Sequence, residues 1–304
     1  MHKRFANALT LLVTAVFMVF TAAAKEGPDQ YPYGAENWMA GAFPPPGTYF
    51  LNYFGYYSGR LRDGSGNRAD LGGKTPSVNA VFDAVRAVHV TKYKLLGGTL
   101  GGHFIAPFVR QSMDLGGSKS RAGIGDFIAG PVAAWHGGKW HFATGLDFVF
   151  PVGTYDKNDP RRCVGAHYYS FEPIAAFTLM PAPGWETSAK LMYNTKTQNT
   201  ASHYQSGDEF HADYAVGKHV GLWSIGASGY FLKQVTDDRV AGAPATAIPG
   251  LWTQGRRGQV FAAGPSVSYT NKRHMTFVAQ WQREVAVRNR FQGDKLWFKV
   301  IIPL

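Results

Sequence analysis

Lys295-Leu-Trp-Phe-Lys-Val-Ile-Ile-Pro-Leu304 closes the sequence, and its apolar side chains recur with period two. One side of this pattern carries Leu296, Phe298, Val300, Ile302 and Leu304. In a soluble sheet protein, such a strand would be an exposed edge that other chains could pair with. In a transmembrane β-barrel, the last strand pairs with the first, and the edge disappears. The stretch therefore favours a closed β-barrel in a membrane.

The first residues have the three parts of a secretory signal peptide. Lys3 and Arg4 are cationic, residues 6–20 are mostly apolar, and residues 21–24 read Thr-Ala-Ala-Ala, which fits an Ala-x-Ala cleavage site. An N-terminal membrane anchor is the alternative, but a spanning helix needs ~20 apolar residues. We expect residues 1–24 to be removed and the protein to be exported.

The rest of the sequence excludes a bundle of membrane helices. After residue 24, no segment approaches the ~18 consecutive apolar residues of a spanning helix. Aromatic residues make up 14% of the chain and there are 36 glycines, which suits many strands joined by tight turns. Cys163 is the sole cysteine, so no intramolecular disulfide can hold an exported chain together.

Twelve segments alternate apolar and polar residues over a length that can cross a membrane. A tilted spanning strand needs ~9–11 residues, and bacterial barrels have an even number of strands. The sequence therefore predicts an all-β fold, a closed antiparallel up-and-down barrel over residues 48–304. Its predicted strands are Thr48–Leu61, Ala80–Leu96, Thr99–Met113, Arg121–Trp135, Trp140–Tyr155, His167–Met180, Trp185–Thr197, Glu209–Val220, Ser224–Val235, Gly258–Thr270, His274–Arg288 and Lys295–Leu304.

The connections between these segments alternate in length. Short turns such as Leu96-Gly-Gly98 and Asn271-Lys-Arg273 come at every second connection. Outer-membrane barrels have short periplasmic turns and longer outside loops, so the alternation supports this class. The longer connections are Arg62–Asn79, Asp114–Ser120, Asp156–Ala166, Gln198–Asp208, Thr236–Arg257 and Asn289–Asp294.

The alternation within each strand predicts which side chains point into the barrel. A charge that faces lipid at mid-depth is unfavourable, so charged residues within strands should face the lumen. They either pair across a closed lumen or line a path for solute. The candidates for such a path are Asp126, Asp147, Glu172, Lys190, His211, Asp213 and Lys299. On the closing strand, Lys295, Trp297 and Lys299 should point inward beside Asn52.

Residues 25–47 precede the first predicted strand and have an unusual composition. Gly34–Gly47 contains a carboxylate, a tryptophan and three consecutive prolines, which favour an extended backbone. The segment is either a periplasmic leader or a plug within the barrel. Under the second interpretation, Glu36, Asn37 and Trp38 form a gate.

Three stretches of the chain carry a resemblance to a known family. Glu36-Asn-Trp-Met39 with Pro44-Pro-Pro-Gly47, Gly123-Ile-Gly-Asp126, and Trp297–Pro303 resemble the MetA-pathway phenol-degradation family. The resemblance spans residues 34–304. It implies an outer-membrane barrel that acts as a transporter or channel, with an association with aromatic catabolism. Leu304 departs from the terminal Phe that is commonest in outer-membrane barrels.

Charge and motifs limit the other classes of function. The chain has a formal net charge of +11, but its cations are scattered over predicted loops and form no single basic surface. Because the protein is also expected to be exported, nucleic-acid binding is disfavoured. Cations outside the membrane can meet lipopolysaccharide phosphates. No Gly-x-Ser-x-Gly elbow, His-Glu-x-x-His or Walker loop occurs, so we expect no catalytic residue, metal or cofactor.

The sequence thus predicts a barrel in the outer membrane of a Gram-negative bacterium. Its expected function is passive uptake of a small hydrophobic or aromatic compound. Its expected partners are that solute, outer-membrane lipid, lipopolysaccharide and the barrel-assembly machinery. The alternatives are a barrel enzyme that acts on lipids, and a structural or surface-interaction barrel.

Overall fold

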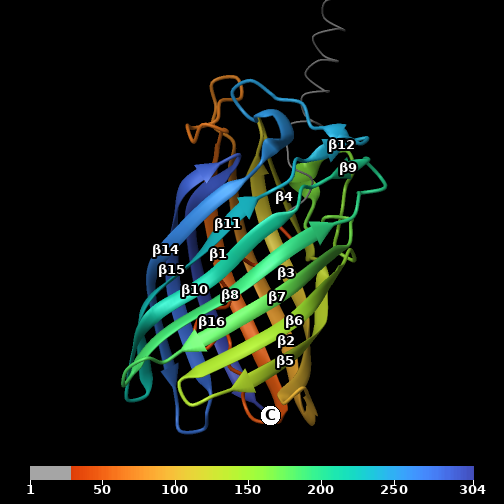
Figure 1. Cartoon of the computed structure of the whole chain (residues 1–304). Coiled ribbons are helices and arrows are strands. Elements are labelled where there is room, and N and C mark those ends of the chain that lie inside the picture. The colour runs from red at the N-terminus through yellow and green to blue at the C-terminus, as the bar shows by residue number, and fades with distance from the viewer. Residues whose placement is uncertain (1–28) are drawn as a thin grey trace, which may run out of the picture.

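The period-two segments form a closed antiparallel barrel in the computed structural model, which describes residues 29–304 (Figure 1). The predicted signal peptide, 1–24, lies outside the described residues. The spanning strands are β1 (Gly47–Arg62), β2 (Ser77–Leu95), β3 (Gly98–Asp114), β4 (Ser118–Ile124) with β5 (Phe127–His136), β6 (Trp140–Phe150), β7 (Ser170–Leu179), β8 (Trp185–Lys196), β10 (Glu209–Val220), β11 (Trp223–Gln234), β14 (Gln259–Thr270), β15 (Thr276–Arg288) and β16 (Arg290–Pro303). Twelve strands are obtained when β4 and β5 are counted as one, and this confirms the predicted fold.

The first and last strands close the barrel. β1 pairs with β16 from Tyr49 opposite Pro303 to Arg62 opposite Arg290 without an interruption. The predicted loop Asn289–Asp294 is wrong, because β16 begins at Arg290. Asn289 is the single residue between β15 and β16, and its φ of 48° lies in the left-handed region that Asn tolerates better than most residues.

Two other predicted strands are interrupted or end more than three residues early, while the remaining bounds, apart from the start of β16, agree within three residues. The segment Arg121–Trp135 is broken at Gly125 and Asp126, where the Gly125 N–H donates to the carbonyl of Pro107 at 2.9 Å. The segment Trp140–Tyr155 ends at Phe150, because Pro151 has no backbone N–H to continue the ladder.

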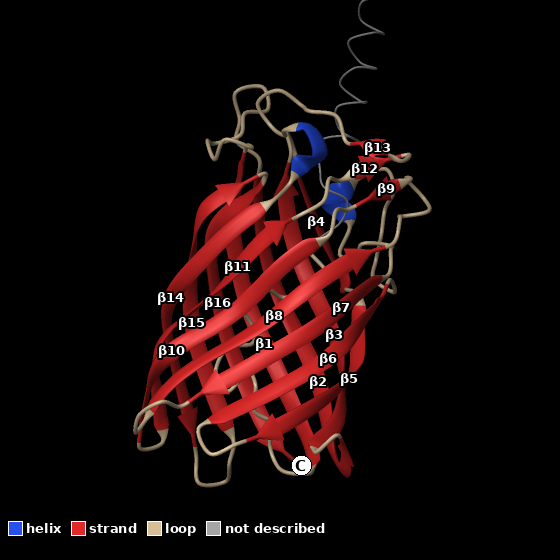
Figure 2. Ribbon diagram, in the orientation of Figure 1, coloured by secondary structure: helices blue, strands red, loops and turns tan. Residues whose placement is uncertain are grey.

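The two ends of the barrel differ, as Figure 2 shows. One end, here called the turn end, has short connections and the C-terminus. The other, the loop end, carries long loops with the short strands β9 (Tyr204–Gln205), β12 (Arg239–Val240) and β13 (Ala243–Pro244), and two 3₁₀ helices, Pro160–Arg162 and Gln254–Arg256. By analogy with other outer-membrane barrels, the turn end faces the periplasm.

An apolar belt covers the outside of the barrel. Phe54, Phe108, Phe177 and Phe298 are among its exposed residues, and Trp140, Trp185 and Trp223 are half exposed at the turn end. Aromatic residues at the border of an apolar band mark a membrane interface. In the described residues no helix is long and apolar enough to cross a membrane. A closed barrel with an apolar belt and aromatic residues at its border has the surface of a transmembrane β-barrel.

Candidate functional site

An inner segment, residues 29–46, runs through the lumen from the loop end to the turn end. At the loop end, Asp29 forms an ion pair with Arg290, the first residue of β16. At the turn end, the Gly41 N–H donates to Thr178 Oγ1 at 3.1 Å, and Phe43 packs against the buried alanine cluster of Ala134, Ala143 and Ala176. The chain then enters β1 at Gly47. The segment expected as a leader or plug therefore lies inside the barrel from Gln30 to Phe43, while Asp29 and residues 44–46 are exposed at its two ends.

Wall carboxylates hold the backbone of the inner segment. Asp213 on β10 accepts hydrogen bonds from the N–H of Gly34 at 2.8 Å and of Glu36 at 3.1 Å. The Tyr31 hydroxyl donates to the same carboxylate at 3.2 Å. Glu186 on β8 accepts from the Met39 N–H at 2.6 Å. An inward-facing acid thus replaces the strand partner that this extended segment lacks.

Glu36 of the inner segment meets a cluster of cations. Its carboxylate lies 2.5 Å from Arg86 on β2 and 3.5 Å from Lys299 on β16, and it accepts from the Tyr53 hydroxyl. The Lys299 ammonium also donates to the carbonyl of Ala35 at 3.1 Å. The carboxylate of Glu36 is thereby balanced by two cations, as a largely buried charge requires.

The next two residues continue the contact toward the turn end. The Asn37 side chain is fully buried and donates to Gln280 on β15. The Trp38 indole N–H donates to Ser266 Oγ on β14 at 2.8 Å. Glu36, Asn37 and Trp38 therefore join the inner segment to the wall on β2, β14, β15 and β16.

Two buried histidine–carboxylate pairs lie along the lumenal wall beside the inner segment, and each joins strands that are two apart in the sheet. His103 Nε2 lies 2.7 Å from Asp147, and His211 Nε2 lies 2.9 Å from Glu172. Asp147 and Glu172 are register partners on β6 and β7. The Tyr31 ring lies with its centroid 4.7 Å from that of His211. These pairs brace the wall against which the inner segment lies.

Asp126 joins three parts of the molecule at the break between β4 and β5. Its carboxylate accepts from Gln30 of the inner segment at 2.7 Å. It also accepts from the backbone N–H groups of Gly153 at 3.0 Å and Ala166 at 2.8 Å, both in the loop between β6 and β7. The aspartate of the Gly-x-Gly-Asp stretch therefore fixes a loop and the inner segment to one point of the wall.

A cavity of about 290 Å³ lies beside the inner segment in the lumen. Its wall on β2 and β3 is apolar, with Val78, Phe82, Ile105 and Val109 among the lining residues. Trp252 of a loop also lines it. A cavity of this volume holds a small molecule, and apolar walls favour a hydrophobic one.

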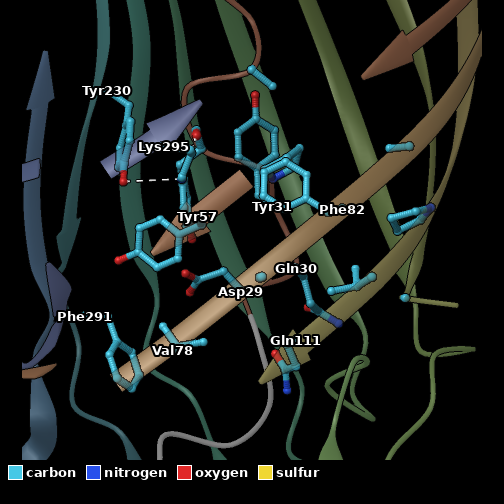
Figure 3. Close-up of a pocket in the computed structure, with 18 of the residues that line it drawn as sticks. Asp29, Gln30, Tyr31, Tyr57, Val78, Phe82, Gln111, Tyr230, Phe291 and Lys295 are labelled. Atoms are coloured by element: carbon cyan, nitrogen blue, oxygen red, sulfur yellow. Dashed lines mark hydrogen bonds between the residues drawn. The ribbon is translucent and has the colours of Figure 1, made fainter. Parts of the chain in front are cut away.

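The opposite side of the cavity is polar, as Figure 3 shows. Tyr57 donates to Glu284 at 2.8 Å, and Tyr230 donates to the other oxygen of the same carboxylate. Lys295 donates to the Tyr230 hydroxyl at 3.4 Å (Figure 3). It also donates to the Tyr33 carbonyl at 3.1 Å. The site thus offers an apolar wall to a ring and hydroxyl and ammonium groups to an oxygen.

The residues predicted for a solute path all face the lumen, but they have different surroundings. Asp126 and Lys190 line the cavity, as does Glu36 of the predicted gate. The others lie against the inner segment or within the buried pairs, namely Asp147, Glu172, His211, Asp213 and Lys299. Asn52 does not point inward beside Lys299, since it donates to Asp83 on the lipid side of β1 and β2. No metal-binding cluster of three or more His, Cys, Asp or Glu occurs in residues 29–304.

Sequence reasoning did not single out the tyrosines of the site. Tyr53 and Tyr57 lie on the same side of β1, so the period-two pattern is sufficient to predict that both face the lumen. Tyr31 and Tyr33 precede every strand, and nothing in their spacing indicates that they enter the barrel. Their position depends on acceptors far along the chain, such as Glu209, to which Tyr33 donates at 2.9 Å.

Solved structures share this architecture. The crystal structure of the COG4313 outer membrane channel from Pseudomonas putida F1 matches with a TM-score of 0.73 and 14% identity, over 91% of this chain and 100% of that one. The translocator domain of the autotransporter NalP from Neisseria meningitidis matches with a TM-score of 0.52 and 9% identity, over 87% of this chain and 91% of that one. Both are similar in fold. No curated protein sequence matches the chain.

A protein family covers most of the sequence. The profile of the family described as "Putative MetA-pathway of phenol degradation" matches residues 58–300. This range contains almost the whole barrel, including the broken strand at Asp126 and most of the closing strand. The chain therefore belongs to the MetA-pathway phenol-degradation family.

Proposed function

We propose that this protein is an outer-membrane channel for the passive uptake of small hydrophobic or aromatic compounds, and not an enzyme. The observation that carries this proposal is the lumenal cavity, which has an apolar wall and a polar side and lies beside a hydrogen-bonded inner segment. The family description names phenol degradation, and the similar Pseudomonas structure is described as an outer membrane channel. The family description supports an aromatic solute, and the similar structure supports a channel.

The proposed path begins at the loop end. A solute from outside passes the loops around Trp252 and rests in the cavity, with its ring on the β2–β3 wall. The inner segment then separates it from the turn end. Thermal movement of this segment opens the path, because an outer-membrane channel of this kind has no energy source of its own.

The gate in this proposal is Glu36, Asn37 and Trp38. Each contributes hydrogen bonds or an ion pair to the wall, and a typical hydrogen bond is worth a net ~0.5–1.5 kcal/mol. Asp147, Glu172, His211, Asp213 and Lys299 would face the path once the segment has moved. On the outside, the apolar belt would contact lipid, and exposed cations such as Lys233 would meet lipopolysaccharide phosphates.

Uptake by whole cells tests the proposal, because a lipopolysaccharide leaflet slows hydrophobic solutes that cross plain phospholipid. A strain without this protein should take up radiolabelled phenol slowly, and the intact gene should restore the rate. Equal rates in both strains would contradict a channel. Purified protein that released fatty acid from outer-membrane lipid would instead favour the enzyme alternative.

A further inference from the structure

Four charged side chains point outward from the barrel at positions within the strands. They are Asp83 on β2, Arg110 on β3, Arg283 on β15 and Asp294 on β16, each at least four residues from its strand's end. Their sequence neighbours on both sides face inward: Phe82 and Ala84 beside Asp83, and Val109 and Gln111 beside Arg110, line the lumenal cavity. By alternation, the charged residues themselves face outward.

These charges occupy one sector of the wall. β15, β16, β1, β2 and β3 are consecutive around the barrel. From β5 round to β14, the lipid-facing charges of the described strands are Lys218 and Lys233, both within two residues of a strand end. Charged residues on a lipid face are destabilising, and more so the deeper they lie. Their restriction to one sector indicates that lipid does not cover it.

Asp83 is the most exceptional of the four. Its cross-strand neighbours are Phe54 and Phe108, which are 43% and 49% exposed on the outer face. Asn52 donates to its carboxylate at 2.8 Å, and among residues 29–304 no basic group lies within ion-pair distance of it. Arg283, in contrast, pairs with Asp294, while its side chain stays 57% exposed. A guanidinium has five N–H donors and can serve a second carboxylate.

The depth of a residue in the membrane follows from the strand register. Residues that are register partners on successive strands form rows that run obliquely around the barrel. The row that starts at Phe50, near the turn end of β1, reaches Thr195, near the loop end of β8. Rows therefore rise from β15 through β1 to β2. With strands ~4.8 Å apart and tilted by ~40°, depth changes by ~3 Å for each strand crossed and ~2.5 Å for each residue along a strand.

Arg283 and Asp83 lie at nearly the same depth by this geometry. Ser58 of β1 pairs with Asp294 of β16, which pairs with Arg283 of β15, so Arg283 lies two strand steps nearer the turn end than Ser58. Asp83 of β2 pairs with Phe54 of β1 and lies one strand step nearer the loop end than Phe54. Along β1, Ser58 is four residues nearer the loop end than Phe54, which is a difference in depth of ~10 Å. The three strand steps together act in the opposite direction by ~9 Å, so Arg283 and Asp83 differ in depth by only ~1 Å.

We propose that a second copy of this chain docks on this sector. A two-fold axis along the membrane normal, beside the β1–β16 seam, brings β15 of one copy opposite β2 of the other. Arg283 then pairs with Asp83 of the partner subunit, and the symmetry repeats this pair. The apolar residues of the seam, Phe54 and Phe298 among them, fill the centre. A self-complementary acid–base pattern at matched depth favours a second copy over lipid.

Cysteine cross-linking in native outer membranes tests the dimer. Leu296→Cys places a thiol on the outer face of β16 next to the axis, and Phe177→Cys places one on β7, on the remote side, with similar exposure. The native Cys163 is buried and is present in both variants. Mild oxidation should give a cross-linked dimer of the chain for Leu296→Cys and none for Phe177→Cys. A monomer in both, or a cross-link to a different protein, would overturn the proposal.

Charge reversal separates pairing from chance contact. In the Leu296→Cys background, Asp83→Arg and Arg283→Asp should each abolish the cross-link, and the two together should restore it. Heat-modifiable migration on gels verifies that each barrel is folded. A cross-link that survives both single reversals, or that the double variant fails to restore while the barrel is folded, would contradict the Arg283–Asp83 pair.

Discussion

The carboxylate of Asp213 on β10 accepts a hydrogen bond of 2.8 Å from the backbone N–H of Gly34, a residue 179 positions earlier in the chain. This contact fixes a segment without a strand partner against the inside of the wall. The same carboxylate holds the N–H of Glu36 and the hydroxyl of Tyr31. One wall residue therefore controls much of the attachment of the inner segment, and its removal should have a specific effect.

Asp213→Ala should increase ion conductance. It leaves the N–H groups of Gly34 and Glu36 without acceptors, and each unpaired buried group costs ~1–3 kcal/mol. The closed arrangement becomes less stable, so single channels in planar bilayers should open more often. Asp208→Ala, which removes a carboxylate that Tyr193 contacts outside the lumen, serves as the control. Unchanged conductance in a folded Asp213→Ala barrel would show that the segment is not a movable gate.

Glu172→Ala should destabilise the barrel. The carboxylate accepts from Asn194 at 2.8 Å and lies 2.9 Å from His211, and all three side chains are buried. Removal of one member of a buried pair typically costs ~3–5 kcal/mol. Urea unfolding followed by tryptophan fluorescence should move to lower denaturant. Asp237→Ala, which removes an exposed pair with Arg257, should have little effect. Equal shifts for both variants would count against the buried pair as a structural brace.

Gly55→Ala should reduce the volume of the cavity. A Cβ at residue 55 would lie 1.9 Å from Cε2 of Phe82, so the Phe82 ring, which lines the cavity, must move. We expect slower phenol uptake from a barrel that still folds. Gly138→Ala, at a turn with nothing within 4 Å of the new Cβ, is the matched control. If uptake is unchanged while the ring has shifted, the cavity is not on the path.

The loop between β6 and β7 should lose its anchor in acid. Burial alone would raise the pKa of Asp159, but hydrogen bonds from Arg161 and Lys119 lower this pKa to about 2. The unfolded loop would have an Asp pKa of ~3.9. The stabilisation is therefore complete above pH ~4 and is lost as the pH falls through about 2.

Pepsin cleavage of the purified barrel across this range measures the effect. The loop should be protected at pH ~4 and cleaved increasingly near pH ~2. Asp159→Asn removes the charge, so the ratio of the native cleavage rate to that of this variant, which cancels the pH dependence of pepsin itself, should rise as the pH falls through about 2. If the variant and the native protein have the same profile, the ion pairs with Lys119 and Arg161 do not hold the loop.

Alternation along the strands is enough to predict the barrel. On β7, Phe171 and Phe177 face lipid while Glu172 is buried, as period two requires. The same pattern places Asp147 and Asp213 inside. The last strand is expected to pair with the first, because an apolar last strand would otherwise form an open edge of the sheet. The β1–β16 register confirms this pairing.

The route of the inner segment could not be derived in this way. Its position depends on acceptors such as Asp213 and Glu186, which belong to distant strands and show no local signal. The break at Asp126 is hidden for a similar reason, because the loop residues Gly153 and Ala166 supply its hydrogen bonds. Long-range contacts of this kind have no periodicity that a single sequence can reveal.

Uptake of radiolabelled phenol by cells that carry a covalently fixed inner segment tests the central claim most directly. Cysteines at Trp38 and Ser266, whose native side chains are hydrogen-bonded at 2.8 Å, can be joined across the space of the removed indole by a bis-methanethiosulfonate cross-linker, which fixes the segment to β14. Our account predicts that cross-linking stops uptake and that reduction restores it, while either single cysteine has no such response. Uptake that continues at the native rate with the cross-link verified by mass spectrometry would contradict a gated path through the lumen.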